Sequence, residues 1–190
     1  MLSQKEFRYC TDCITVHGKY WLKTLDKFKG QPVQYLEIGV LEGRTFNWVF
    51  ENFLTHRKSR ATVVDVFFDL DMQQNFMHNL SLAGNRRRTR IVRGFSQQAL
   101  RTLEINSFDI IYIDGSHEGS DVLADGVQAW ELLKVGGVMI FDDYLLDEEE
   151  YVVQPKKAID AFLEIYGHEL RILHKDEQIH IEKLKTKPVI

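Results

Sequence analysis

Five carboxylates in this sequence each lie at the end of an apolar run, in a pattern that would bring them to one edge of a β-sheet. They are Glu37, Asp65, Asp114, Asp142 and Asp143. The carboxyl ends of parallel strands meet at one edge, which is where open α/β sheets bind their ligands. Carboxylates gathered there repel one another unless a cation or hydrogen-bond donors lie between them. The pattern therefore predicts a functional site at that edge.

A glycine-containing turn connects the first of these runs to a predicted helix. In the stretch Tyr35–Thr45, an apolar strand ends at Gly39, and Gly43 follows four residues later. Glycine has no Cβ and adopts positive φ easily, so a ligand can approach the backbone closely there. The N–H groups that begin a helix attract polar or negatively charged ligand atoms. A turn of this kind after the first strand is typical of sites for nucleotide-like cofactors.

Apolar strands alternate with amphipathic helices over most of the chain, and these elements must position the five carboxylates. Strands are predicted at Gln34–Ile38, Ala61–Val66, Thr89–Arg93, Asp109–Asp114 and Val138–Asp142. Helices are predicted at Thr45–Leu54, Asp71–Leu82, Gln97–Leu103, Asp121–Leu133 and Pro155–Tyr166. The run before Asp114 is almost continuously apolar, as expected for a strand covered on both faces of a parallel sheet.

The two ends of the chain have different patterns. Residues 1–31 have helical spacing, with a capping-box pattern at Ser3 and Glu6, which predicts a helix or a pair of helices. Leu170–Leu173 and Gln178–Ile181 flank a polar turn and predict a closing β-hairpin. The whole pattern predicts an α/β fold: a doubly wound, mostly parallel, seven-stranded Rossmann-like sheet with a C-terminal antiparallel hairpin. We expect one domain over residues 1–190, with its cofactor-binding core in residues 32–190.

Composition excludes several classes of protein. The chain has 190 residues, of which 44% are hydrophobic, so it is long enough to bury a full core. Its formal net charge of −4 argues against a general attraction to nucleic acid. No apolar run is long enough to span a bilayer, and the polar N-terminus does not resemble a signal peptide. The two cysteines do not make a disulfide framework, so we expect a cytoplasmic protein.

Several short motifs occur in the order and spacing of a known enzyme family. They are Glu37-Ile38-Gly39-x-x-x-Gly43-x-Thr45, Asp65, Gly94-Phe95-Ser96, Ile113-Asp114-Gly115-Ser116-His117 and Gly136-Gly137-x-x-Ile140-Phe141-Asp142-Asp143-Tyr144. With these motifs, the chain resembles the class I S-adenosylmethionine-dependent methyltransferases over residues 34–184. The resemblance is greatest to the metal-dependent O-methyltransferases of the catechol and macrolide-sugar types.

The resemblance implies where S-adenosylmethionine would bind. The glycine turn would line the methionine part of the cofactor, with Glu37 and Thr45 at its polar ends. Asp65 would accept hydrogen bonds from the two ribose hydroxyls, and Ser96 would meet the adenine edge together with Gln97. The implied cofactor-binding residues are Glu37, Gly39, Val40, Gly43, Thr45, Asp65, Val66, Gly94, Ser96 and Asp114.

The resemblance also implies a metal ion and a base. Asp114, Asp142 and Asp143 match the family's metal ligands, and such hard oxygen ligands suit Mg²⁺ or a similar cation. The cation would bind a substrate oxygen, lower its pKa and hold it near the methyl group. His117 lies where the catechol enzymes have a catalytic lysine, and a histidine can accept a proton near neutral pH. His117 and Asp114 are therefore the implied catalytic residues.

Simpler roles stay open for these residues. Asp114 would then bind only the cofactor's amine, and Asp142 and Asp143 would only cap the segment that follows them. His117 would stack on adenine or pair with an acid. The sequence also departs from the family, because Leu41 replaces a middle glycine and Asp143 replaces the asparagine of the catechol type. It has no long insertion that could form a lid.

The sequence therefore predicts a methyltransferase that uses S-adenosylmethionine to methylate a hydroxyl of a small substrate. The alternative is a non-catalytic protein or subunit that binds S-adenosylmethionine and needs a partner. An oxidoreductase is a weaker hypothesis, because the turn lacks the G-x-G-x-x-G pattern that fits a dinucleotide. We also expect a homo-oligomer, in which the helices around Trp21 cover a neighbour's open rim; the other interpretation is that Trp21 packs within its own chain.

Overall fold

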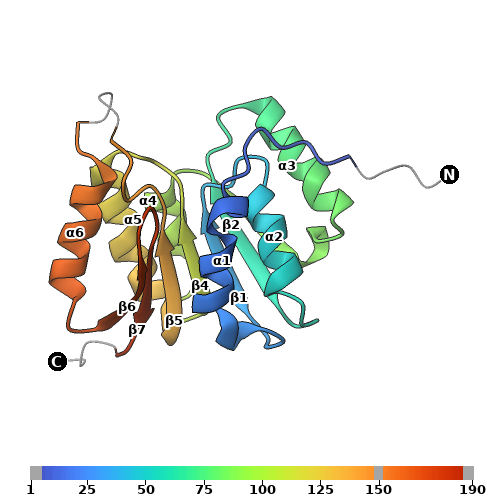
Figure 1. Ribbon diagram of the computed structural model, residues 1–190. Coiled ribbons are helices and arrows are strands. Elements are labelled where there is room, and N and C mark those ends of the chain that lie inside the picture. The colour runs from blue at the N-terminus through green and yellow to red at the C-terminus, as the bar shows by residue number, and fades with distance from the viewer. Residues whose placement is uncertain (1–5, 148–151, 186–190) are drawn as a thin grey trace.

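A seven-stranded sheet forms the centre of the molecule (Figure 1). The computed structural model describes residues 6–147 and 152–185. The strands are β1 (Gln34–Ile38), β2 (Arg60–Asp65), β3 (Thr89–Arg93), β4 (Phe108–Ile113), β5 (Leu133–Phe141), β6 (Leu170–Lys175) and β7 (Ile179–Lys183). Their order across the sheet is β3-β2-β1-β4-β5-β7-β6. Neighbours among β1 to β5 pair in parallel, whereas β7 is antiparallel to both β5 and β6.

Helices cover both faces of this sheet (Figure 1). The α-helices are α1 (Ile14–Thr24), α2 (Arg44–Asn52), α3 (Leu70–Leu82), α4 (Ser96–Ala99), α5 (Gly119–Leu132) and α6 (Pro155–Tyr166). Three short 3₁₀ helices are η1 (Asp26–Phe28), η2 (Arg86–Arg88) and η3 (Leu100–Thr102). Helices α1 to α3 pack on one face and α4 to α6 on the other, around two separate groups of buried apolar residues. The predicted doubly wound α/β fold is confirmed.

The central strand β4 shows why the sequence forms two layers of core. Side chains alternate between the two faces of a strand. Ile111 and Ile113 therefore pack with α4 to α6, while Ile110 and Tyr112 pack with α1 and α2. A strand covered on both faces needs apolar side chains at nearly every position, which is the pattern of this segment.

Helix α1 packs tightly against its own sheet through Trp21. The side chain of Trp21 is fully buried, and its ring makes edge contacts with Tyr112 and Trp48 at centroid distances of 4.9 Å and 6.1 Å. Trp21 therefore packs within its own chain, and the expectation that it covers the rim of a neighbouring subunit is wrong. The homo-oligomer itself stays a prediction.

The predicted elements are confirmed with a few local differences. Strand β5 begins at Leu133 instead of Val138, because Leu133 pairs with Phe108 ahead of a shift in register. The helix predicted at Gln97–Leu103 is divided into α4 and η3. The first helix begins only at Ile14, and the Ser3 half of the predicted capping box lies outside the described residues. Within residues 6–147 and 152–185, each helix is too short or too polar to cross a bilayer.

Candidate active site

The turn after β1 lies too close to the end of β4 for any side chain at Gly39. Gly39 has a φ of 79°, and a Cβ built on it would lie 2.0 Å from the carbonyl oxygen of Asp114. Backbone hydrogen bonds fix this approach, because Gly39 N–H donates to Val64 and Asp114 N–H donates to Ile38. The turn therefore exposes bare backbone at the carboxyl edge of the sheet.

Asp65, the last residue of β2, holds the same turn from the side. Its Oδ2 accepts the N–H of Val40 at 2.8 Å, and its Oδ1 accepts the N–H of Phe67 at 2.7 Å. A carboxylate has about four acceptor positions, so each oxygen retains one for a ligand hydroxyl. Asp65 is thus a support of the glycine turn and a candidate acceptor for a pair of neighbouring hydroxyls.

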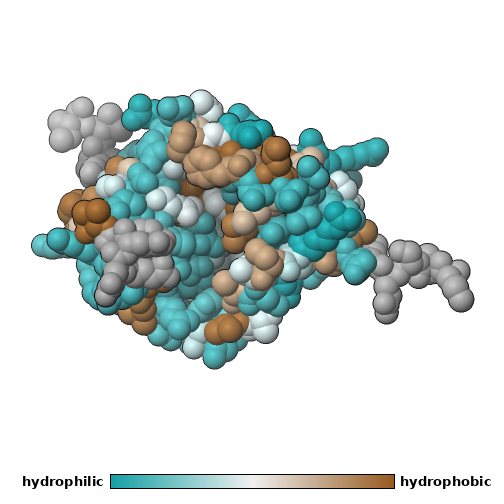
Figure 2. All heavy atoms as spheres, turned by 90° about the horizontal axis from the view of Figure 1, so that it is seen from above, coloured by the Kyte–Doolittle hydropathy of each residue, from teal (hydrophilic) through white to brown (hydrophobic). Residues whose placement is uncertain are grey.

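A pocket of about 580 Å³ opens at this edge of the sheet. Most of the residues implied to bind the cofactor line it: Gly39, Val40, Asp65, Val66, Gly94, Ser96 and Asp114. Figure 2, which looks down on this edge, shows hydrophobic side chains gathered among hydrophilic ones. The pocket is large enough for a nucleoside with a short side chain, and its mixed lining suits such a ligand.

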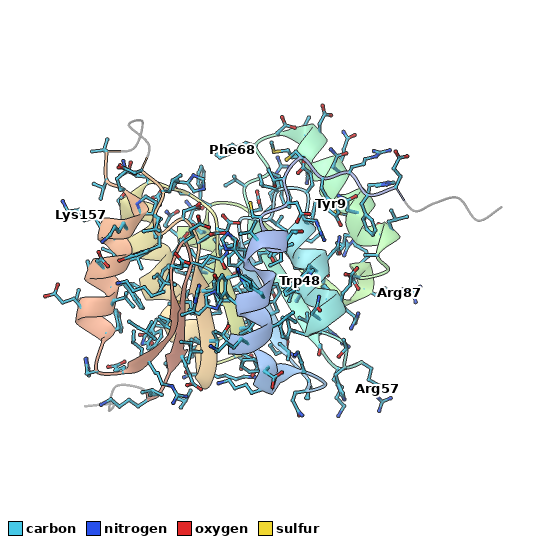
Figure 3. All side chains as sticks on the ribbon, in the orientation of Figure 1. Tyr9, Trp48, Arg57, Phe68, Arg87 and Lys157 are labelled. Carbon is cyan, nitrogen blue, oxygen red and sulfur yellow. The ribbon has the colours of Figure 1, made fainter. Side chains whose placement is uncertain are left out.

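Two exposed aromatic rings stand at the mouth of the pocket. Phe68 and Phe95 both line it, although 82% of Phe68 and 56% of Phe95 is exposed. Their ring centroids lie 6.0 Å apart in an edge-to-face arrangement. Figure 3 shows Phe68 at the carboxyl edge, whereas Arg57 lies at the opposite end of the sheet. The exposed apolar surface is therefore concentrated where a ligand would enter.

One part of the pocket lining is a connected set of polar side chains. Asp121, in the first turn of α5, accepts from Gln97 Nε2 at 2.9 Å and from Ser116 Oγ at 2.8 Å. Asp125, one turn further along α5, takes the hydroxyl of Ser96 and has its pKa raised to about 6 by burial. Sequence reasoning missed both aspartates of α5, because their partners on α4, Gln97 and Ser96, lie more than 20 residues away.

Three residues of the implied cofactor set, Glu37, Gly43 and Thr45, do not line this pocket. Glu37 is buried within the sheet, where it accepts the hydroxyl of Tyr35, and burial raises its pKa to about 8. Gly43 is the N-cap residue directly before α2, with a φ of 78°, and a Cβ there would lie 2.8 Å from the ring of Phe76. Packing therefore accounts for Gly43, and direct contact between Glu37 and a ligand stays untested.

A second cluster, the acidic rim, adjoins the pocket and consists of Asp114, His117, Asp142 and Asp143. Three possible ligand atoms, one each from Asp114, His117 and Asp143, all lie within 4.8 Å of one another. His117 Nε2 is 3.1 Å from Asp143 Oδ2. Asp143 adopts a φ of 57°, in the left-handed region that few residues other than glycine enter.

Asp142 joins the acidic rim through a shared tyrosine instead of through His117. The hydroxyl of Tyr112 lies within hydrogen-bond distance of both carboxylates, at 2.9 Å from Asp114 and closer to Asp142, and its single proton is donated to one of them at a time. Asp142 Oδ1 accepts the N–H of Asp143 at 2.9 Å. Burial, followed by repulsion from the neighbouring aspartates, raises the pKa of Asp114 well above its ordinary value and raises that of Asp142.

Sequence reasoning missed Tyr112 and Gln178, which form hydrogen bonds with the carboxylates of the acidic rim. Tyr112 precedes Asp114 by two positions on the same strand, so the two-residue period of a strand could have placed both on one face. Gln178 had no such signal. It accepts from Trp21 Nε1 at 2.8 Å and forms a hydrogen bond with Asp142, so it connects α1 to the rim.

Comparison with known proteins identifies the family. A family model described as a methyltransferase domain matches residues 36–144, which contain the glycine turn, Asp65, Asp114 and the paired aspartates. The chain belongs to this methyltransferase family. No curated protein sequence matches this methyltransferase significantly.

Solved structures with the same fold include several methyltransferases. One is the O-methyltransferase TomG from Streptomyces achromogenes, in complex with S-adenosylmethionine. It has a TM-score of 0.71 and 14% sequence identity, and the match covers 92% of this chain and 82% of TomG. Another is an O-methyltransferase from Bacillus cereus, in complex with S-adenosylhomocysteine. It has a TM-score of 0.67 and 17% sequence identity, and the match covers 93% of this chain and 84% of the Bacillus cereus chain.

A third structure is MycE from the mycinamycin biosynthetic pathway, in complex with Mg and S-adenosylhomocysteine. It has a TM-score of 0.63 and 15% identity, and it covers 94% of this methyltransferase and 56% of MycE. The family match and these folds confirm the resemblance to the class I S-adenosylmethionine-dependent methyltransferases.

Proposed function

We propose that this protein transfers the methyl group of S-adenosylmethionine to a hydroxyl of a small substrate, assisted by Mg²⁺ or a similar cation. The observation that carries the proposal is the position of Asp114, which lines the cofactor-sized pocket and also belongs to the acidic rim. A methyl donor bound in the pocket and a substrate hydroxyl bound at the acidic rim would therefore both lie next to Asp114. The S-adenosylmethionine, S-adenosylhomocysteine and Mg in the neighbouring structures support this assignment.

The donor set of the acidic rim fits a hard divalent cation. Asp114, Asp142 and Asp143 offer carboxylate oxygens, which Mg²⁺ and Mn²⁺ prefer. The repulsion that raises the pKa values of Asp114 and Asp142 would be relieved by a positive charge between them. When bound, the cation supplies a Lewis acid that lowers the pKa of a substrate hydroxyl.

His117 is the proposed base at this rim. Its Nε2 lies 3.1 Å from Asp143, an arrangement that orients the ring and stabilises the imidazolium once a proton is taken. Asp65 and the glycine turn would hold the donor, while Tyr112 fixes the carboxylates of Asp114 and Asp142. In this way the chain's own residues orient both reactants and accept the proton.

The first experiment tests the donor and the chemistry separately. Calorimetry should show binding of S-adenosylhomocysteine and none of NAD⁺. A panel of small hydroxylated compounds should then give methylated product that is lost in EDTA and restored by Mg²⁺. Full activity in EDTA would contradict the metal role. Binding without turnover over the whole panel would favour the non-catalytic alternative.

The second experiment separates a base from a ligand at His117, because the cluster of Asp114, His117 and Asp143 allows both. If His117 is the base, His117→Ala lowers turnover but leaves the affinity for Mn²⁺, measured by electron paramagnetic resonance, within about twofold of wild type. If His117 is a ligand, the same variant weakens Mn²⁺ binding as strongly as Asp143→Ala does.

A further inference from the structure

The polar end of the pocket contains a fixed pattern of donors and acceptors. Gln97 at the start of α4, Ser116 after β4 and Asp121 in α5 all line the pocket. Asp121 Oδ1 accepts from Gln97 Nε2 at 2.9 Å, and Asp121 Oδ2 accepts from Ser116 Oγ at 2.8 Å. Each oxygen of this carboxylate therefore faces a donor from a different wall of the pocket.

The charge of Asp121 decides how the Gln97 amide must point. An ionised carboxylate only accepts hydrogen bonds, whereas an amide has one donating end and one accepting end. Gln97 must therefore turn its NH₂ group toward Asp121. Its carbonyl oxygen, Oε1, makes no hydrogen bond with any residue in the part of the chain that the structure describes, so it remains available as an acceptor at the pocket wall.

Ser96 also lines this end of the pocket and is held by an aspartate of α5. Its hydroxyl is held by Asp125, one helical turn after Asp121 on the same face of α5. The two aspartates of α5 thus hold the two polar side chains that begin α4. Of these two, only the Gln97 amide has a donor end and an acceptor end that could be exchanged by turning the side chain over. The exposed ring of Phe95, directly before them, adds apolar surface against which a flat base can pack.

We propose that Asp121 is a specificity-determining positioning residue, which fixes the Gln97 amide so that the pocket selects a purine with an exocyclic amine over one with a keto oxygen. The inference rests on the proposed function, because it places the base of the cofactor at this end of the pocket. An amine donates to Gln97 Oε1, while a keto oxygen would face that same acceptor and be repelled. A ligand that leaves this acceptor without a donor gives up a hydrogen bond, so the pocket discriminates between the two purines.

The test compares two ligands by calorimetry: S-adenosylhomocysteine and S-inosylhomocysteine, in which a keto oxygen replaces the amine. Wild type should bind the first at least about tenfold more tightly. In Asp121→Asn the new amide can either donate to or accept from Gln97, so the Gln97 side chain can turn over. The ratio of the two dissociation constants should then fall to about threefold or less. Asp71→Asn, which removes an exposed acid from the first turn of α3, should keep the wild-type ratio.

A second variant shows whether Asp121 acts through Gln97. Gln97→Met should reduce the ratio as Asp121→Asn does, and the double variant should show no further reduction. An unchanged ratio in Asp121→Asn, or a parallel loss of affinity for both ligands, would overturn the role of Asp121. Equal affinity of wild type for both ligands would also overturn the role of Asp121, but S-adenosylmethionine would remain the proposed cofactor. Binding of neither ligand by wild type would overturn the proposed cofactor, and the inference with it.

Discussion

The indole Nε1 of Trp21 donates a hydrogen bond of 2.8 Å to Oε1 of Gln178, which lies 157 residues later in the chain. An indole nitrogen can only donate, so this bond orients the Gln178 amide with its NH₂ group toward the carboxylate of Asp142. The hydrogen bond from Gln178 lowers the pKa of Asp142, against the larger raising effect of burial. A buried tryptophan on α1 thus sets the orientation of a carboxylate at the acidic rim.

Trp21→Phe should therefore reduce turnover by more than the loss of packing at this position would cause. Phenylalanine keeps an aromatic ring but has no indole N–H, so Gln178 loses the donor that orients its amide. We expect turnover to fall about tenfold with weaker Mn²⁺ binding. The free energy of unfolding should fall by about 1–2 kcal/mol. Trp48→Phe, in the same aromatic cluster, is the matched comparison and should leave Mn²⁺ binding unchanged. Equal Mn²⁺ affinities in wild type and Trp21→Phe would contradict the prediction.

Asp65→Ala should weaken binding of S-adenosylhomocysteine by about 1–3 kcal/mol, because the ribose hydroxyls lose a charged acceptor. The N–H groups of Val40 and Phe67 lose their acceptor as well, so the melting temperature should also fall. Calorimetry and thermal unfolding of the same sample measure the two effects. An unchanged affinity would remove Asp65 from the ribose role, whatever the change in stability.

Gly39→Ala should be far more damaging than the same change at Gly84. Both glycines have positive φ, at 79° and 77°, so each substitution incurs backbone strain of about 1–2 kcal/mol. A Cβ at Gly84 would meet nothing within 4 Å, whereas at Gly39 it would strike the backbone of Asp114. We expect Gly39→Ala to cost about 3 kcal/mol or more in chemical unfolding, with loss of cofactor binding. Similar costs at the two positions would contradict the close approach of the two strand ends.

Glu37 should make stability fall as pH rises toward alkaline values. Its pKa is about 8 in the folded protein against an ordinary value of 4.5, so between these values the folded state holds a proton that the unfolded chain has released. The contribution of Glu37 is therefore fully present below about pH 4.5 and declines, by up to about 1.4 kcal/mol per pH unit, until about pH 8.

Urea unfolding of Glu37→Gln at several pH values between 5 and 8.5 measures this contribution. The variant cannot ionise at this position, so its stability relative to wild type should increase with pH. Glu104→Gln, at an exposed acid, should follow the wild-type curve. A constant difference between Glu37→Gln and wild type across the range would contradict the raised pKa.

Local patterns in the sequence were enough to predict most of the sheet and one wall of the site. The apolar runs of β1, β2 and β4 and the glycine turn are local features, and they predict Gly39, Asp65 and Asp114 at the edge of the sheet where these residues line the pocket. The strand β5 was predicted too short, because its first residues pair through a register shift that only the partner strand defines.

The remaining parts of the site depend on contacts between distant residues. Sequence spacing put Asp114, Asp142 and Asp143 at one edge, but the group within 4.8 Å contains His117 instead of Asp142. That difference arises because Tyr112 and Gln178 hold the Asp142 carboxylate. The strand period gives the face of Tyr112, but nothing in the local sequence brings Gln178 to this carboxylate. The metal role of all three aspartates stays a prediction.

The insertion of β7 between β5 and β6 also has a consequence for how the protein is made. The residues that line the pocket lie between Ile38 and Asp121, whereas Gln178, which orients Asp142, precedes β7 near the end of the described chain. At about 5–20 residues per second, a ribosome completes the pocket segment a few seconds before it adds that glutamine. Because a domain generally folds as a unit, the acidic rim cannot be complete until nearly the whole described chain has been synthesised.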